Sequence, residues 1–226
     1  MSIIFQFNNL YFTVKIINVN FTYISLTLGN IMNNLFKGAF QKSINVKKKC
    51  LNQGFYDLCK MAEIMSNSLL SSGKILICGN GGSAADAQHL VAELLVRLRP
   101  HINRQPIPAI TLAQDISTIT ACANDYSFDE VFSRNLMALG KSGDCLLGIS
   151  TSGKSKNIIN AMKVASNLKI RVFGFLGKGG GDCLELCEHS FLVPSDDTAA
   201  IQEAHITAGH ALMEAIENNF IEKSNF

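Results

Sequence analysis

His89 and Glu93 carry the clearest chemical signal in the chain, because an imidazole and a carboxylate stand four residues apart in a segment expected to be helical. Side chains at positions i and i+4 point from the same face of a helix, so both can reach one ligand. Spacing alone leaves two interpretations open. The residues form either a surface pair or two ligands of a divalent metal ion.

A second group of polar side chains lies near the C-terminus, where Gln202, Glu203, His205 and His210 occur in another expected helix. Gln202 and His210 are separated by two helical turns, or roughly 12 Å of rise. They reach one metal ion only if their side chains lean towards it, or if one of them comes from a neighbouring subunit. We expect His205 to be structural.

Two loops contain the groups that bind anions. The first loop, which we call the glycine turn, consists of Asn80, Gly81 and Gly82. It follows a short apolar run and precedes Ser83, which is a good N-cap. Residues 150–155, the serine loop, read STSGKS and also lie between an apolar run and a helix. Hydroxyls and backbone N–H groups at a helix N-terminus suit a monoester phosphate, whereas the alternative for the serine loop is simple capping.

The elements that must hold these residues alternate between strand and helix. Apolar runs predict strands at 75–78, 107–112, 144–150, 170–176 and 189–194. Helices are expected from Ser83 onward and at 115–122, 128–139, 155–167 and 198–222, with turns at 124–125 and 177–181. Apolar strands that alternate with helices predict a three-layer α/β/α sandwich around a mostly parallel five-stranded sheet. Ligands bind such sheets at the carboxyl ends of the strands, which brings the two loops and the 124–125 turn to one edge.

The first 30 residues differ from the rest of the chain. They are rich in Phe, Ile and Asn, with Lys15 as the one charged side chain, and asparagines interrupt every apolar run. We expect an extension at 1–30 that is not essential, or a true start at Met32, although an extra strand pair is an alternative. Residues 31–72 predict a pair of helices, so the predicted main domain covers 31–226.

Composition excludes several classes of protein. A net charge of +2 over 226 residues, without a basic stripe, argues against a nucleic-acid surface, and no run is long enough to span a membrane. The seven cysteines show no CxxC spacing, so neither a zinc ribbon nor a thioredoxin-type centre is indicated. We expect a reduced, cytoplasmic protein.

Four separated blocks now identify a resemblance: CGNGGSAADAQHLVAEL, ANDYSFDEVFSR, GDCLLGISTSGKSKNII and VPSDDTAAIQEAHITAGH. From residue 31 onward the chain resembles the sugar isomerase (SIS) domain family, with its flavodoxin-like fold, and within it the bacterial phosphoheptose isomerases. The resemblance implies isomerisation of sedoheptulose 7-phosphate to D-glycero-D-manno-heptose 7-phosphate, the first step towards the heptose of the lipopolysaccharide core. It also implies a homotetramer with active sites at subunit interfaces.

The resemblance assigns roles to individual residues. It implies one zinc ion per subunit, and it makes Glu93 and His210 the catalytic pair. The implied zinc ligands are His89, Glu93, Gln202 and His210. The implied substrate contacts are Asn80, Gly81, Gly82, Glu93, Asn124, Asp125, Ser150, Thr151, Ser152, Ser155 and Gln202.

Two other functions are weighed against catalysis. Some SIS proteins bind the replication initiator DnaA and lack the catalytic Glu and His, both of which this chain has as Glu93 and His210. Sugar-phosphate-sensing SIS regulators usually carry a DNA-binding domain, and no helix-turn-helix pattern precedes the first strand. The chain departs from the family pattern at Ala200, where an arginine is common, and at Val96, where glycine is frequent.

Overall fold

The computed structural model describes residues 2–7, 10–15, 21–113 and 115–224, with side chains for 29–113 and 115–223. The chain divides into two compact units, Met1–Lys42 and Ser43–Phe226. Within the described ranges, no helix combines the length and the apolar character needed to cross a lipid bilayer.

The first unit contains a strand pair. Strand β1 (Ser2–Phe7) pairs antiparallel with β2 (Leu10–Lys15). Helix α1 (Phe21–Gln53) begins in this unit and ends in the second, so the first helix starts earlier than the expected residue 31. The division into an extension of residues 1–30 and a catalytic domain of residues 31–226 stays a prediction.

Five strands of the second unit form one sheet in which all neighbouring pairs are parallel. The order across the sheet is β4-β3-β5-β6-β7. The strands are β3 (Ile75–Gly79), β4 (Ala109–Thr111), β5 (Cys145–Ser150), β6 (Arg171–Leu176) and β7 (His189–Leu192). Every residue of β3 and β5 is buried, as expected for strands covered on both faces. The predicted parallel sheet is confirmed.

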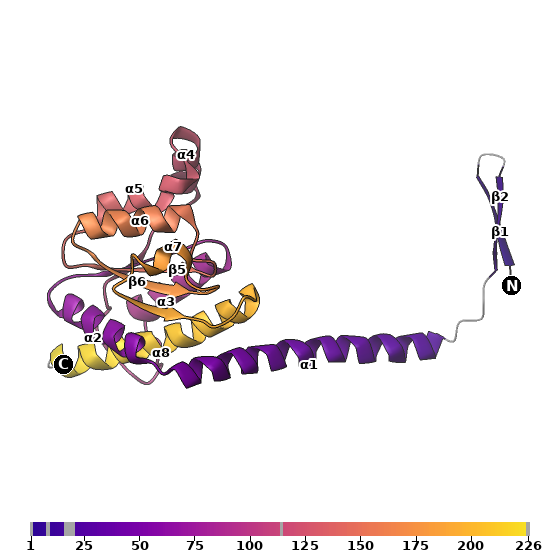
Figure 1. The fold of residues 1–226 in the computed structure, drawn as a ribbon, viewed down its shortest axis with the longest axis horizontal. Coiled ribbons are helices and arrows are strands. Elements are labelled where there is room, and N and C mark those ends of the chain that lie inside the picture. The colour runs from indigo at the N-terminus through magenta and orange to yellow at the C-terminus, as the bar shows by residue number, and fades with distance from the viewer. Residues whose placement is uncertain (1, 8–9, 16–20, 114, 225–226) are drawn as a thin grey trace. The chain divides into compact units, whose positions relative to one another are not determined.

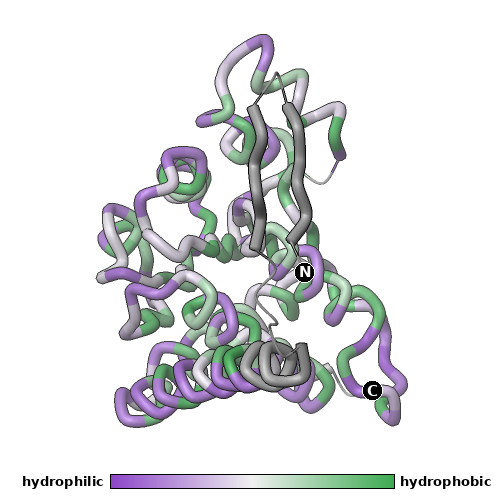
Figure 2. Tube along the Cα trace, turned by 90° about the vertical axis from the view of Figure 1, so that its right-hand side faces the viewer, coloured by the Kyte–Doolittle hydropathy of each residue, from purple (hydrophilic) through white to green (hydrophobic). Residues whose placement is uncertain are grey.

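Helices cover both faces of the sheet and complete the three predicted layers (Figure 1). The helices that follow α1 are α2 (Tyr56–Leu70), α3 (Gly82–Leu95), α4 (Ile116–Asp125), α5 (Val131–Leu139), α6 (Lys156–Asn167), α7 (Gly181–Leu184) and α8 (Thr198–Ser224). On one face of the sheet the core includes Leu90 of α3 and Met213 of α8, and on the other Phe132 of α5 and Met162 of α6. Most helical turns of the tube carry both green hydrophobic and purple hydrophilic residues (Figure 2), in keeping with helices that bury one face on a sheet.

The start of α3 corrects one local expectation. The helix begins at Gly82 with Gly81 as its N-cap, so the expected cap, Ser83, lies inside the first turn and is buried. Gly81 has a φ of 55°, a left-handed value that glycine adopts without steric cost. The glycine turn therefore passes directly from β3 into α3.

The region around α4 differs from expectation as well. Asn124 and Asp125 form the last turn of α4 rather than a free turn, because the Tyr126 N–H donates to the Cys122 carbonyl at 3.0 Å. The helix expected at 128–139 is a 3₁₀ turn, η1 (Phe128–Glu130), followed by α5. Strand β4 is shorter than the predicted 107–112, and the loop expected at 177–181 ends in the first turn of α7.

The strand order creates a crevice between two central strands. In order of appearance the sheet reads 2-1-3-4-5, so the connections after β3 and β5 leave in opposite directions. Ligands bind doubly wound sheets at this switch point, beyond the carboxyl ends of the strands. Gly79 lies opposite Ile149 in the register, so the glycine turn and the serine loop begin at the same level of the sheet.

Helices α3 and α8 approach each other closely at Gly209. A Cβ atom at this position would lie 2.7 Å from Cδ2 of Leu90, which is fully buried. The absence of a side chain at Gly209 therefore sets the separation of the two helices. This separation in turn sets the distance between polar side chains that the two helices carry.

A buried carboxylate joins the far end of the same two helices. Glu217 of α8 is 1% exposed and accepts hydrogen bonds from Nε of Arg99 (2.6 Å) and Nε of Arg104 (2.5 Å). Arg104 also donates to the carbonyl oxygens of Glu93 and Leu94, which have no helical partner at the end of α3. Arg104 thus caps α3 and connects it to α8.

Replacing Gly209 by Ala should destabilise the protein. The added methyl group overpacks the contact with Leu90, which we expect to cost about 1–3 kcal/mol, reduced by up to about 1 kcal/mol for the better helix propensity of alanine. Urea titration measures the free energy of unfolding. Gly38→Ala in α1 is the matched control, because an added Cβ there meets nothing within 4 Å. Equal stability of Gly209→Ala and the native chain would show that α3 moves away from α8 at little cost.

Candidate active site

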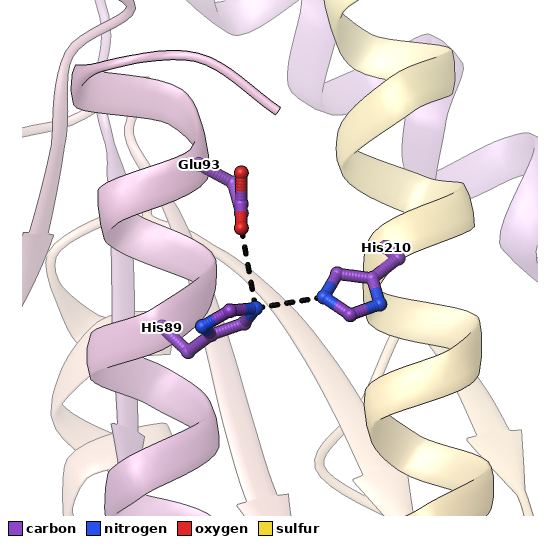
Figure 3. Close-up of side chains that lie close together, drawn as sticks. All are labelled: His89, Glu93 and His210. Carbon is purple, nitrogen blue, oxygen red and sulfur yellow. Dashed lines mark hydrogen bonds and ion pairs between the residues drawn. The ribbon is translucent and has the colours of Figure 1, made fainter. Parts of the chain in front are cut away.

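Three potential metal ligands converge between α3 and α8 (Figure 3). His89 and Glu93 come from α3 and His210 from α8, and we call this group the HEH cluster. The Nε2 atoms of His89 and His210 are 2.7 Å apart, and Nε2 of His89 lies 3.2 Å from Oε1 of Glu93. One ligand atom from each residue lies within 4.8 Å of the other two.

The cluster fits a zinc ion in donor type and in size. Two imidazole nitrogens and one carboxylate oxygen are ligands that catalytic zinc uses, with a fourth position left for a further ligand. Bonds of about 2.0–2.1 Å in a tetrahedral site separate neighbouring donors by roughly 3.3 Å, so the two histidines need to open by only about half an ångström. The His89 side chain is 49% exposed, which leaves the cluster open to small molecules. Within the described ranges, it is the one group of three or more His, Cys, Asp or Glu side chains that meets this geometry.

Asp86 belongs to the surroundings of the cluster, and the sequence analysis missed it. It lies one helical turn before His89 on α3, and its Oδ2 atom is buried without a hydrogen-bond partner. Burial raises the pKa of its carboxyl group, while the charges of His89 and His210 oppose that shift. Carboxylates commonly orient ligating histidines, and the i, i+3 spacing of Asp86 and His89 was the available signal.

Gln202 lies beside the glycine turn. Its amide packs so closely on Gly82 that a Cβ atom there would lie 2.5 Å from the Gln202 Nε2. Gly82 precedes His89 by about two turns of α3, as Gln202 precedes His210 on α8. The structure therefore places the Gln202 amide at the sheet edge, while its predicted part in metal binding stays a prediction.

The glycine turn and the serine loop begin at the same edge of the sheet. Ser150 is buried, and its Oγ accepts a hydrogen bond from the Gly153 N–H and lies 3.1 Å from the Ser155 Oγ. Ser152 accepts from the Lys154 N–H through its hydroxyl, so the hydroxyls fold the loop onto itself. Thr151 lies partly exposed at its centre. The loop is thus ordered at the N-terminus of α6, where an anion is stabilised.

Asn124 and Asp125 are not brought to the HEH cluster within one chain. They lie at the end of α4, on the face of the sheet opposite α3 and α8, and the Asn124 amide donates to the Asp125 carboxylate at 2.8 Å. Both side chains are exposed. Their predicted contact with substrate therefore requires either an extended ligand or a second subunit.

His205 is a core residue. It is fully buried between Phe175 and Phe191, and its Nε2 donates to the Leu176 carbonyl at 3.1 Å. Burial lowers the pKa of its imidazole to about 4, so the ring is neutral in the folded protein at neutral pH. The structural role expected for His205 agrees with this environment.

The departures from the family pattern lie in different environments. Ala200 is buried in the core at the first turn of α8, where its N–H donates to the Asp197 carboxylate. Val96 is the C-cap of α3 and is 70% exposed.

Comparison with known proteins adds independent evidence. The SIS domain family model matches residues 40–177. A phosphoheptose isomerase from Clostridium acetobutylicum is 43% identical over 188 residues, which cover 82% of this chain and 95% of the relative. The chain belongs to the phosphoheptose isomerase family. Phosphoheptose isomerase 1 from Campylobacter jejuni is 50% identical over 163 residues, covering 72% of this chain and 87% of that protein.

A solved structure from the family has the same architecture. The phosphoheptose isomerase from Francisella tularensis superposes with a TM-score of 0.79 at 36% identity, covering 83% of this chain and 98% of that one. The family and its fold, both expected from the four sequence blocks, are therefore confirmed. As a member of the family the protein is an isomerase of carbohydrate metabolism.

Metal content tests the HEH cluster. We expect the protein purified without chelators to carry about one divalent ion per chain, and His89→Ala to lose it, because two ligands remain. Gln202→Ala should lower the metal content less than His89→Ala does, because the three ligands of the HEH cluster remain. Elemental analysis provides the measurement, with exposed His101→Ala as the matched control. Full metal content in His89→Ala would contradict the site, and unchanged metal content in Gln202→Ala would count against Gln202 as the fourth ligand.

His205 should make the protein sensitive to acid. Its pKa is lowered in the folded state, so the stabilisation is complete above the unfolded pKa of about 6.5 and is lost as the pH falls towards about 4. The loss amounts to at most about 3 kcal/mol. His205→Gln keeps an N–H donor but does not titrate, so its urea midpoint should fall less between pH 7 and pH 5. Parallel midpoints for the two proteins would contradict a buried neutral imidazole.

Proposed function

We propose that the protein isomerises sedoheptulose 7-phosphate to D-glycero-D-manno-heptose 7-phosphate. The observation that carries this proposal is the convergence of His89, Glu93 and His210 in a member of the phosphoheptose isomerase family. A base, a second proton carrier and an electrophile are the groups that a ketose–aldose isomerase needs.

The reaction moves one proton between neighbouring carbons through an enediol. In our proposal the Glu93 carboxylate takes the proton from C1 and returns it to C2. His210 donates a proton to O2 as the enediol forms and accepts one from O1 as the aldehyde forms, so protons balance over the cycle. Glu93 is only 16% exposed, which keeps competing water from the carboxylate.

Zinc is the proposed cofactor, one ion per chain, held by His89, Glu93 and His210, with Gln202 as the fourth ligand implied by resemblance. When bound, the metal supplies a Lewis acid for the carbonyl oxygen. A side chain that holds a metal is a poorer proton carrier, so we assign Glu93 and His210 to the metal only in the resting enzyme.

Substrate binding is assigned to the switch point of the sheet. The serine loop, with Ser150, Thr151, Ser152 and Ser155, is proposed to anchor the phosphate at the N-terminus of α6. Asn80, Gly81, Gly82 and Gln202 are proposed to contact the sugar. Binding the remote phosphate helps to hold the sugar in a reactive pose.

The proposed assembly is a homotetramer with active sites at its subunit interfaces. Asn124 and Asp125 support it, because they lie on the face opposite the HEH cluster and reach a site most directly from a neighbouring chain. We further propose that the enzyme is cytoplasmic and supplies heptose for lipopolysaccharide, without a nucleic-acid or membrane partner.

Incubation with sedoheptulose 7-phosphate tests the function. We expect the aldose product, and we expect Glu93→Gln to lower kcat by at least about 1,000-fold because the base is lost, with little change in substrate binding. Glu63→Gln on α2 is the matched control, since Glu63 is exposed and pairs with Lys60. Absence of turnover in the native protein, with and without zinc, would contradict the proposal. A fully active Glu93→Gln would remove Glu93 from the mechanism.

A further inference from the structure

Asn157, a residue outside the predicted site, bonds directly to the glycine turn. Its Nδ2 donates to Oδ1 of Asn80 at 2.9 Å, and Nδ2 of Asn80 donates back to Oδ1 of Asn157 at 2.9 Å. Asn157 lies in the first turn of α6, directly after the serine loop, and is 2% exposed. The two side chains thus form a reciprocal amide pair across the switch point.

A third hydrogen bond fixes the orientation of this pair. Oδ1 of Asn157 also accepts from the Ile158 N–H at 3.0 Å, so the oxygen end of the Asn157 amide must face that N–H. The NH₂ group of Asn157 must then face Asn80, which determines the position of the Asn80 oxygen. One donor hydrogen of Asn80 remains for a ligand. Asn157 therefore selects which groups Asn80 presents to the crevice.

The pair also joins two segments that lie beyond the paired residues of β3 and β5, namely the glycine turn and the first turn of α6. Asn80 follows β3, and Asn157 follows β5 and the serine loop. Buried side-chain amides that are fully paired hold their partners rigidly, whereas an unpaired one is costly. The distance between the proposed sugar contact and the proposed phosphate anchor therefore depends on this pair.

We propose that Asn157 is a positioning residue for the isomerase reaction: through Asn80 it orients the glycine turn relative to the serine loop, so that sugar and phosphate are bound in register. This inference rests on the proposed function for its substrate. It predicts that Asn157 acts on substrate binding without touching the reacting carbons.

Asn157→Asp tests this role, because it keeps the size of the side chain and the oxygen facing Ile158 but replaces the NH₂ donor to Asn80. We expect KM for sedoheptulose 7-phosphate to rise about tenfold, as for the loss of one buried hydrogen-bond partner, while kcat changes less than about threefold. Asn160→Asp is the matched control. Asn160 lies on the same helix, but its amide bonds to Asp129 and Glu130 rather than to the glycine turn. The melting temperature of each variant shows whether the substitution destabilises the fold. Only Asn157→Asp should change KM.

A double-mutant cycle separates positioning from general destabilisation. If Asn157 acts through Asn80, then Asn157→Asp has no further effect on KM in an Asn80→Ala background, whereas Asn160→Asp has the same small effect in both backgrounds. Additive effects of Asn80→Ala and Asn157→Asp would overturn the proposal. An unchanged KM in Asn157→Asp alone would overturn it as well.

A measurement without substrate keeps the inference separate from the reaction. Hydrogen exchange followed by mass spectrometry should show at least about tenfold faster exchange in residues 79–84 and 150–155 of Asn157→Asp, and no such change in Asn160→Asp. If the native protein does not turn over the substrate, the proposed function fails while exchange still decides the role of Asn157. Unaltered exchange in both segments would overturn that role.

Discussion

The packing of α3 against α8 at Gly209 is the contact on which the candidate site depends. The two helices run in the same direction, so Gly82 meets Gln202 near their starts and His89 meets His210 two turns later. Glu217 and Arg104 join their far ends. Because all these contacts belong to one helix pair, a small change in the separation of the helices moves His210 relative to both His89 and Glu93. The chemistry of the site is therefore a property of helix packing as much as of individual residues.

The parallel sheet supplies the second constraint. Strands β3 and β5 are neighbours in register, so the loops that leave them start level with each other on either side of the switch point. The helix after β3 covers one face and the helix after β5 the other, which opens the crevice between the loops. The Asn80–Asn157 amide pair crosses this crevice. Helix packing thus organises the proposed reacting groups, and the sheet organises the proposed binding groups.

Local sequence patterns predicted the features that depend on residues close together in the chain. His89 and Glu93 share a face because helical spacing requires it, and the apolar runs of β3 and β5 allowed few alternatives. Contacts between distant segments could not be predicted from spacing, so the meeting of His89 with His210 was left open and Asn157 was overlooked. Asn124 and Asp125 were misplaced because these residue types favour turns, whereas here the helix continues through them. A tertiary contact decided the cases of His210 and Asn157, whereas a local helical hydrogen bond decided that of Asn124 and Asp125.

The separation of the two halves of the HEH cluster along the chain has a consequence for biosynthesis. Glu93 belongs to the first βα unit of the sheet, but His210 lies on the last helix, more than a hundred residues later. At about 5–20 residues per second, a ribosome needs on the order of ten seconds to pass from one to the other. During that interval the nascent chain already exposes two ligands without the third. The proposed metal centre can form only after α8 has left the exit tunnel and packed on α3, which would link metal acquisition to the final stage of folding.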